Sequence, residues 1–161
     1  MLKLKGSIKI SGDKSISHRS LIIAAMSVGE TQIRNLLESE DILSTVNILK
    51  CLGIKISKTR EYWKVIGNGT GGFLEPEKEL DCGNSGTTAR LMIGAVASNP
   101  IQCTFIGDNS LSKRPMSRVT DYLKKMGAQS KLTRSDFLPL FIDGNDKLLP
   151  MKHIMKSASA Q

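Results

Sequence analysis

The sequence predicts an α/β fold that is built from a repeated βαβαββ unit. The first observation behind this prediction is internal similarity: GDKSISHR at residues 12–19 aligns with GNSGTTAR at residues 83–90, and a small-residue apolar run follows each stretch. The second observation is that further matches follow in the same order. LKCLG at residues 49–53 matches LKKMG at residues 123–127, and each is followed by a strand-like segment that ends in glycine. Ordered internal matches of this kind are typical of a duplicated structural unit.

The first helix and its neighbouring strands are expected near the start of the chain. Residues 8–10 have the character of a short strand, and Ser15 or Ser17 can cap a helix that runs to about Val28. Residues 31–35 then have strand character, which completes the first half of the βαβαββ pattern.

A second helix is expected to begin near Ser39 and to stop at Gly53. Acidic residues fill its first turn, where the helix dipole favours them, and glycine is a frequent C-terminal stop. Apolar residues recur at three- and four-residue spacing along one face of this helix: Ile42, Val46, Leu49 and Leu52. Residues 54–57 and 62–66 suit a strand pair, and the glycine-rich stretch 67–72 is interpreted as a turn because it lacks the Lys-Ser/Thr ending of a P-loop.

The second unit repeats this order. Thr87 or Thr88 can cap its first helix, and Pro115 suits the first turn of its second helix, which we expect to end at Gly127. A small, hydroxyl-bearing stretch at residues 157–161 resembles the segments that open the first two units. We therefore expect a chain that is truncated early in a third unit.

Composition favours a cytosolic protein with small anionic partners. The 161 residues carry a net charge of +8, no apolar run is long enough to span a bilayer, and the N-terminus has no secretory signal. Cys51, Cys82 and Cys103 have no metal-ligand spacing and are expected to be reduced and structural. Aromatic residues make up only 4% of the chain, which disfavours stacking on nucleic-acid bases and leaves small anions as the preferred ligands.

A cationic helix N-terminus is the first candidate site. Residues 12–19 form a loop that enters a helix, and the free N–H groups and dipole of such a terminus attract phosphate. Lys14 adds a positive charge, and Ser15 adds a hydroxyl donor. Arg19 lies one turn after Ser15 on the same face, where its guanidinium can bind a phosphate or carboxylate. An ordinary N-cap with solvated charges is the alternative, which the three side chains together disfavour.

Two further stretches have a similar character. In residues 81–90, glycines such as Gly86 permit a close backbone approach and Asn84 can donate or accept a hydrogen bond, although a plain glycine turn is an equally good interpretation. In residues 107–118, Arg114 precedes a proline and is therefore expected to be extended, within reach of the same helix ends.

The remaining polar residues are predicted to have structural or solvated roles. Lys113 and Arg118 are expected to be solvated, and His18 and His153 lack a partner pattern and are interpreted as surface or capping residues. Three aspartates are expected in turns and caps: Asp13, Asp81 and Asp108. No nucleophile with a base and no suitably spaced carboxylate pair is recognisable in the sequence.

These motifs together closely resemble the EPSP synthase family, the 3-phosphoshikimate 1-carboxyvinyltransferases. The family's signature stretches correspond to GDKSISHR at residues 12–19, LDCGNSGTTARL at residues 80–91, GDNSLSKRPMSR at residues 107–118 and SAQ at residues 159–161, in the family's order. The resemblance implies an enolpyruvyl transferase-like inside-out barrel domain, in which residues 13–161 form two complete repeat units and the start of a third. It also implies that residues 1–12 form a strand that belongs with a C-terminal domain missing from this sequence.

The resemblance also implies a reaction. Members of the family transfer the enolpyruvyl group of phosphoenolpyruvate to the 5-hydroxyl of shikimate 3-phosphate, releasing phosphate, in the pathway to chorismate and the aromatic amino acids. They need no metal or organic cofactor. Because the family's key carboxylates and a further lysine lie in its later half, this chain alone is expected to be inactive, and the full-length enzyme is expected to be a cytoplasmic monomer.

Site residues are carried over by motif position. Shikimate 3-phosphate is expected to contact Lys14, Ser15, Arg19, Ser159, Ala160 and Gln161. Phosphoenolpyruvate is expected to contact Lys14, Asn84, Gly86, Thr87, Arg114 and Gln161. Lys14 is the expected catalytic residue in this part of the family's chain, Arg90 is expected to support the site, and no metal ligand is expected.

Two other functions stay open at the level of sequence. The related UDP-N-acetylglucosamine enolpyruvyl transferases share the fold, but they use a Lys-Asn pair near the start and a loop cysteine. This chain has Lys14 followed by Ser15, and Cys103 lies in a strand-like run. A non-catalytic module that binds RNA or another polyanion is the second alternative, since relatives of the repeat occur in RNA-processing proteins. The scattered charges and scarce aromatic residues disfavour it.

Overall fold

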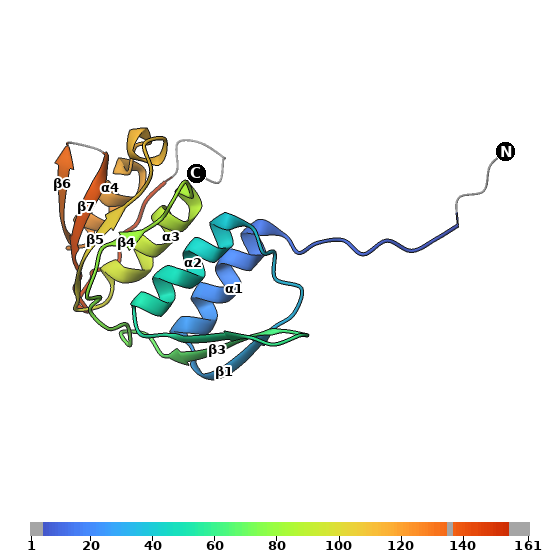
Figure 1. Cartoon of the computed structure of the whole chain (residues 1–161). Coiled ribbons are helices and arrows are strands. Elements are labelled where there is room, and N and C mark those ends of the chain that lie inside the picture. Colours follow the sequence, from blue (N-terminus) through green and yellow to red (C-terminus); the bar gives the residue numbers. More distant parts are fainter. Residues whose placement is uncertain (1–4, 135–136, 155–161) are drawn as a thin grey trace.

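Two β-sheets with α-helices on their inner faces make up the structure, a computed structural model that describes residues 5–134 and 137–154 (Figure 1). Helix α1 packs on strand β3 of the first sheet, and helix α3 packs on strand β7 of the second. The helices also pack on one another, α1 on α2, α2 on α3 and α3 on α4. Helices therefore fill the inside and sheets form the outer walls, as the predicted α/β repeat requires.

The first repeat unit forms a three-stranded antiparallel sheet with the strand order β1-β3-β2. Its elements are α1 (Lys14–Met26), β1 (Val28–Ile33), α2 (Glu40–Cys51), β2 (Lys55–Lys58) and β3 (Trp63–Asn68). In this chain residues 5–13 have no regular secondary structure, and Ile8 and Ile10 are 88% and 71% exposed, so the expected strand at residues 8–10 and its place with a C-terminal domain stay predictions. A strand needs a neighbouring strand for its backbone hydrogen bonds, and no described segment pairs with this one.

The second repeat unit contains the full βαβαββ order. Its four-stranded sheet has the order β4-β5-β7-β6, with β4 parallel to β5 and the other neighbours antiparallel. Its elements are β4 (Leu80–Asp81), α3 (Gly86–Ala97), β5 (Gln102–Ile106), α4 (Ser117–Lys125), β6 (Gln129–Arg134) and β7 (Phe137–Asp143), with a short 3₁₀ turn η1 (Leu111–Lys113) before α4. The first unit matches this order from α1 onward. The predicted start of a third unit lies outside the described residues.

The apolar stripe predicted on α2 is confirmed. Its four members are at most 2% exposed: Ile42, Val46, Leu49 and Leu52. They join buried side chains of both units, including Leu21 of α1 and Met92 of α3, in a single hydrophobic core. Since each fully buried large apolar side chain contributes about 1.5–3 kcal/mol, this shared core holds the two units in one relative position.

Asp13 caps α1, where Ser15 or Ser17 was predicted. Its side chain accepts a hydrogen bond from the N–H of Ile16 at 2.8 Å, which satisfies one of the free donors of the first turn. The helix also ends at Met26, so β1 begins earlier than predicted. The serines are thereby left inside the helix, with their hydroxyls available for other partners.

The caps of the second unit differ from the prediction in the same way. Ser85 caps α3 by accepting from the N–H of Thr88 at 3.1 Å, so neither Thr87 nor Thr88 is the cap. Helix α4 follows the N-cap Met116, so Pro115 precedes the helix instead of occupying its first turn. The three aspartates predicted in turns and caps are confirmed: Asp13, Asp81 and Asp108 each accept a nearby backbone N–H.

The cysteines are free, as predicted, and differ in burial. Cys51 is half-buried, whereas Cys82 and Cys103 are buried. Burial raises the pKa of both buried thiols to about 12. Within the described residues, no group of histidine, cysteine and acidic side chains could hold a metal ion, and no helix has the length and apolar character needed to cross a membrane.

Candidate functional site

The N-terminal turns of α1 and α3 meet at a cationic hollow of about 380 Å³. Because the two helices pack against each other, their equivalent motifs face the same space. The hollow is lined by Ser15, Arg19, Gly86, Thr87, Arg90, Leu91 and Val119. The structure thus brings together five of the residues predicted from the two motifs, and no carboxylate is found among the described residues that line the hollow.

Arg114 reaches the N-terminus of α3 from the third motif. Its backbone is extended, with φ −93° and ψ 133°, as predicted from the following proline. Its Nη2 donates to Asn84 Oδ1 at 2.9 Å and to Ser110 Oγ at 3.2 Å, and its Nη1 donates to the Asn84 carbonyl at 3.3 Å. Asn84 in turn donates to Asp108 Oδ2 at 2.6 Å. These contacts orient the guanidinium beside the free N–H groups of the helix terminus.

Gly86 leaves the space that two guanidinium groups need. A Cβ at this position would lie 2.9 Å from Arg90 Nη1 and 3.4 Å from Arg114 Nη1. The first distance is too short for a real Cβ contact and the second is at the lower limit of an ordinary van der Waals contact, so a side chain would push the Arg90 guanidinium away from the first turn of α3 and crowd that of Arg114. The glycine therefore allows two cations to lie against one helix N-terminus.

Arg90 carries a buried donor with no partner. Its Nη2 donates to the Pro115 carbonyl at 3.1 Å, but its buried Nε has no hydrogen-bond partner among the described residues. Burial lowers the pKa of Arg90, and the charges of Arg118 and Arg114 lower it further. Arg118, expected only to be solvated, therefore adds positive potential here. An anionic oxygen would satisfy such an orphaned donor, which is otherwise costly.

Lys14 does not line the hollow. Its ammonium forms an ion pair with Asp41 in the first turn of α2, and the lysine side chain is half exposed. The sequence did not predict this pair, because the partners lie on different helices. Arg19 stays close to its own helix and donates to the Ser15 carbonyl at 3.1 Å. Three further predicted contacts lie outside the described residues: Ser159, Ala160 and Gln161.

His18 is fully buried, so its interpretation as a surface or capping residue was wrong. Its Nδ1 lies 2.8 Å from Thr45 Oγ1, on the next helix. The one sequence signal of a buried polar partner for His18 was Thr45, a hydroxyl residue on the otherwise apolar face of α2. His153 agrees with the prediction: it is exposed and its ring lies 4.6 Å from that of Tyr122.

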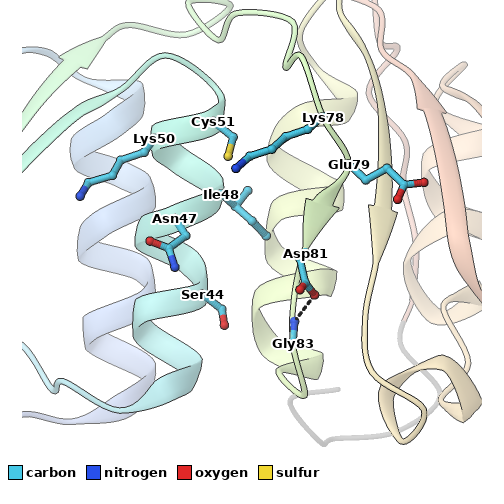
Figure 2. A pocket seen from close by; sticks show the side chains of 9 residues that line it. All are labelled: Ser44, Asn47, Ile48, Lys50, Cys51, Lys78, Glu79, Asp81 and Gly83. Carbon is cyan, nitrogen blue, oxygen red and sulfur yellow. Dashed lines mark hydrogen bonds between the residues drawn. The ribbon is translucent and has the colours of Figure 1, made fainter.

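A larger hollow of about 500 Å³ lies between α2 and the segment that contains β4. Figure 2 shows its lining, with Lys78 reaching toward α2 and Glu79 pointing away. Asp81 accepts the Gly83 N–H at 2.8 Å in this hollow. None of the predicted site residues that the structure describes lines it, and its charges are mixed. Size alone therefore does not identify the anion site, whereas the converging guanidinium groups do.

Comparison with known proteins gives a consistent result. The family model for EPSP synthase (3-phosphoshikimate 1-carboxyvinyltransferase) matches residues 1–161. The 3-phosphoshikimate 1-carboxyvinyltransferases of Novosphingobium aromaticivorans and Ruegeria sp. are 48% and 50% identical over 159 residues, which is 98% of this chain and 36% and 35% of theirs. The chain spans about a third of the length of these curated relatives.

Solved structures agree with the sequence relatives. EPSP synthase from Acinetobacter baumannii superposes with a TM-score of 0.91 at 36% identity, covering 96% of this chain and 35% of that one. This likeness confirms the predicted fold class. The chain belongs to the EPSP synthase family.

Proposed function

We propose that this chain supplies one wall of the active site of a 3-phosphoshikimate 1-carboxyvinyltransferase. The proposed reaction transfers the enolpyruvyl group of phosphoenolpyruvate to the 5-hydroxyl of shikimate 3-phosphate and yields EPSP and phosphate. The observation that carries the proposal is the convergence of Arg90 and Arg114 on the N-terminal turn of α3, with Arg19 across the hollow. Both substrates are phosphorylated, and both suit a site of this charge.

Each substrate is assigned to one helix terminus. The first turn of α3 and Arg114 suit phosphoenolpyruvate, because planar guanidinium groups bind carboxylates and phosphates in bidentate fashion. Ser15 and Arg19 on α1 suit the phosphate of shikimate 3-phosphate. Lys14 would leave Asp41 to contact both substrates. The contacts expected from residues 159–161 stay predictions.

Binding is separate from turnover in this proposal. Proton transfer to the enolpyruvyl methylene and from the 5-hydroxyl needs acid and base groups. The hollow contains arginines and hydroxyls but no carboxylate in its described lining. We therefore expect the 161-residue chain to bind its ligands without catalysing the reaction. We expect the full-length enzyme to be cytoplasmic and monomeric.

Calorimetric titration of the 161-residue chain with phosphoenolpyruvate and with shikimate 3-phosphate tests the proposal. Arg114→Ala should weaken phosphoenolpyruvate binding by roughly 10- to 150-fold, the equivalent of one charge-assisted hydrogen bond of about 1.5–3 kcal/mol. Arg60→Ala removes the same charge from an exposed turn and is the matched control. Equal losses in both variants would mean that only net charge matters and would contradict a built site.

A short RNA and UDP-N-acetylglucosamine serve as competing ligands. Saturable binding of the shikimate compound, with neither competitor bound, supports the proposal. RNA binding with a steep salt dependence would instead support a polyanion-binding module. Binding of the UDP sugar in preference to shikimate 3-phosphate would favour the sister transferase.

A further inference from the structure

We propose that His18 is a positioning residue. Its imidazole is neutral, carries its proton on Nδ1 and starts a buried chain of hydrogen bonds that fixes the N-terminal turns of α1, α2 and α3 relative to one another. The statement that these turns face the substrates depends on the proposed function. The hydrogen-bond chain itself, and the tautomer that it requires, are independent of that function.

The chain of hydrogen bonds has one side chain on each of three helices. From His18 Nδ1 on α1 it runs 2.8 Å to Thr45 Oγ1 on α2, and from there 2.9 Å to Thr88 Oγ1 on α3. Thr88 Oγ1 lies 3.0 Å from the carbonyl oxygen of Asp41, back in the first turn of α2. All three side chains are fully buried. The chain therefore connects both repeat units through the core.

Counting protons selects one tautomer. If Nδ1 carries the proton, it donates to Thr45 and the Thr45 hydroxyl donates to Thr88. The Thr88 hydroxyl then donates to the Asp41 carbonyl at 3.0 Å or to Ser85 Oγ at 2.8 Å, so that each of these three donors has an acceptor. Only the Nε2 lone pair is then unpaired, since Nε2 is buried and has no partner among the described residues. Under-satisfied acceptors are tolerated more often than orphaned donors.

The other protonation states are less favourable. A proton on Nε2 would be a buried donor without an acceptor, at a cost of about 1–3 kcal/mol. The imidazolium has the same orphaned donor and adds a buried charge. Burial lowers the pKa of His18, the carboxylate of Asp41 raises it, and the charges of Lys14 and Arg19 lower it, which together favour the neutral ring.

The connected turns are those that carry the candidate site. Lys14, Ser15 and Arg19 lie within one turn of His18 on α1. Thr88 follows Gly86 in the first turn of α3. The Asp41 residue that ends the chain through its carbonyl also pairs with Lys14 through its carboxylate. A change at His18 would therefore move the ligand-binding groups of both helices without direct contact with any ligand.

Long-range ¹⁵N NMR of the imidazole ring in the 161-residue chain tests the tautomer. The His153→Asn variant leaves His18 as the single histidine, because the sequence contains two. We expect a protonated Nδ1 and an unprotonated Nε2 at pH 7. A spectrum with the proton on Nε2, or of an imidazolium, would overturn the assignment. This readout requires no ligand, so it stands or falls separately from the proposed function.

Phosphoenolpyruvate titration tests the positioning role. Asparagine places an amide N–H where Nδ1 lies, whereas glutamine places it near Nε2. We therefore expect His18→Asn to bind within about threefold of the parent chain, and His18→Gln to lose about tenfold, the equivalent of one net hydrogen bond. Thr45→Val should remove the difference between the two variants, since it interrupts the chain.

Controls separate positioning from general destabilisation. His153→Gln, at an exposed histidine outside the candidate site, should bind as the parent does. Far-UV circular dichroism checks that each variant is folded at the titration temperature. Equal affinity losses for His18→Asn and His18→Gln would overturn the positioning role. If the parent chain itself binds no phosphoenolpyruvate, the proposed function fails and so does the positioning role, while the tautomer assignment is still decided by NMR.

Discussion

Replacing Gly86 with alanine should weaken anion binding without harming the fold. The added Cβ would lie 2.9 Å from Arg90 Nη1 and 3.4 Å from Arg114 Nη1, and 3.7 Å from Leu111 Cδ1. The two closest neighbours are the flexible ends of arginine side chains, which can move by a few tenths of an ångström. Gly86 has a helical backbone that alanine adopts readily, so the helix has no reason to change.

The stability and affinity effects have opposite signs. Removing a glycine from a helix stabilises it by up to about 1 kcal/mol, which offsets the small cost of moving two side chains. Affinity depends on where the guanidinium groups lie, and each charge-assisted hydrogen bond to an anion contributes about 1.5–3 kcal/mol. Losing one such bond raises the Kd by roughly 10- to 150-fold.

The assay compares Gly86→Ala with Gly94→Ala on the same helix. A Cβ at Gly94 would meet nothing within 4 Å, so this variant makes the same chemical change away from the arginines. We expect both variants to keep the parent's Tm or raise it, and only Gly86→Ala to lose phosphoenolpyruvate affinity in a calorimetric titration. Unchanged affinity in Gly86→Ala, or a fall in its Tm, would refute the steric argument.

Three further predictions concern reactivity and stability. Maleimide labelling at pH 8 should modify Cys51 first and reach Cys82 and Cys103 only on unfolding, because burial raises the pKa of both buried thiols to about 12. Burial also lowers the pKa of His18 from 6.5, so the folded chain binds fewer protons than the unfolded chain. The free energy of unfolding should therefore be highest above pH 6.5 and decrease as the pH falls toward the lowered pKa. His18→Asn should remove that decrease in urea denaturation measured over a series of pH values. Leu49→Ala should lower the free energy of unfolding by about 2–5 kcal/mol, measured by urea denaturation, because this side chain is fully buried.

Each of these predictions has a contradicting outcome. Equal labelling rates for all three thiols would show that the core opens readily. An identical pH dependence in the parent and His18→Asn would mean that another group is responsible. Leu43→Ala, on the same helix but 37% exposed, should cost much less than Leu49→Ala; equal costs would place the core elsewhere.

The repeat and the helical stripe could be predicted because they depend on local patterns. The spacing of Ile42, Val46, Leu49 and Leu52 identified the buried face of α2 with no knowledge of its neighbours. The strand at residues 8–10 had a suitable local pattern, but strand formation depends on a partner elsewhere in the chain. Its expected partner belongs to a C-terminal domain, so this strand stays a prediction.

The polar contacts between helices could not be predicted from spacing. The partner of His18, Thr45, lies 27 residues away, and Thr88, which bonds to Thr45, lies a further 43 residues along; only the packing of α1, α2 and α3 brings the three together. The pairing of Lys14 with Asp41 has the same origin. Gly86 was recognised as a close-approach position, but its reason, the meeting of two guanidinium groups, required the structure.

The most direct test of the candidate site is a map of amide chemical shifts as phosphoenolpyruvate is added to the ¹⁵N-labelled 161-residue chain. The proposed site predicts that the largest changes fall in the N-terminal turns of α1 and α3, including Gly86 and Thr87, and on Arg114. Changes centred on Lys50 and Lys78, in the larger hollow between α2 and β4, would contradict it, as would an unchanged spectrum.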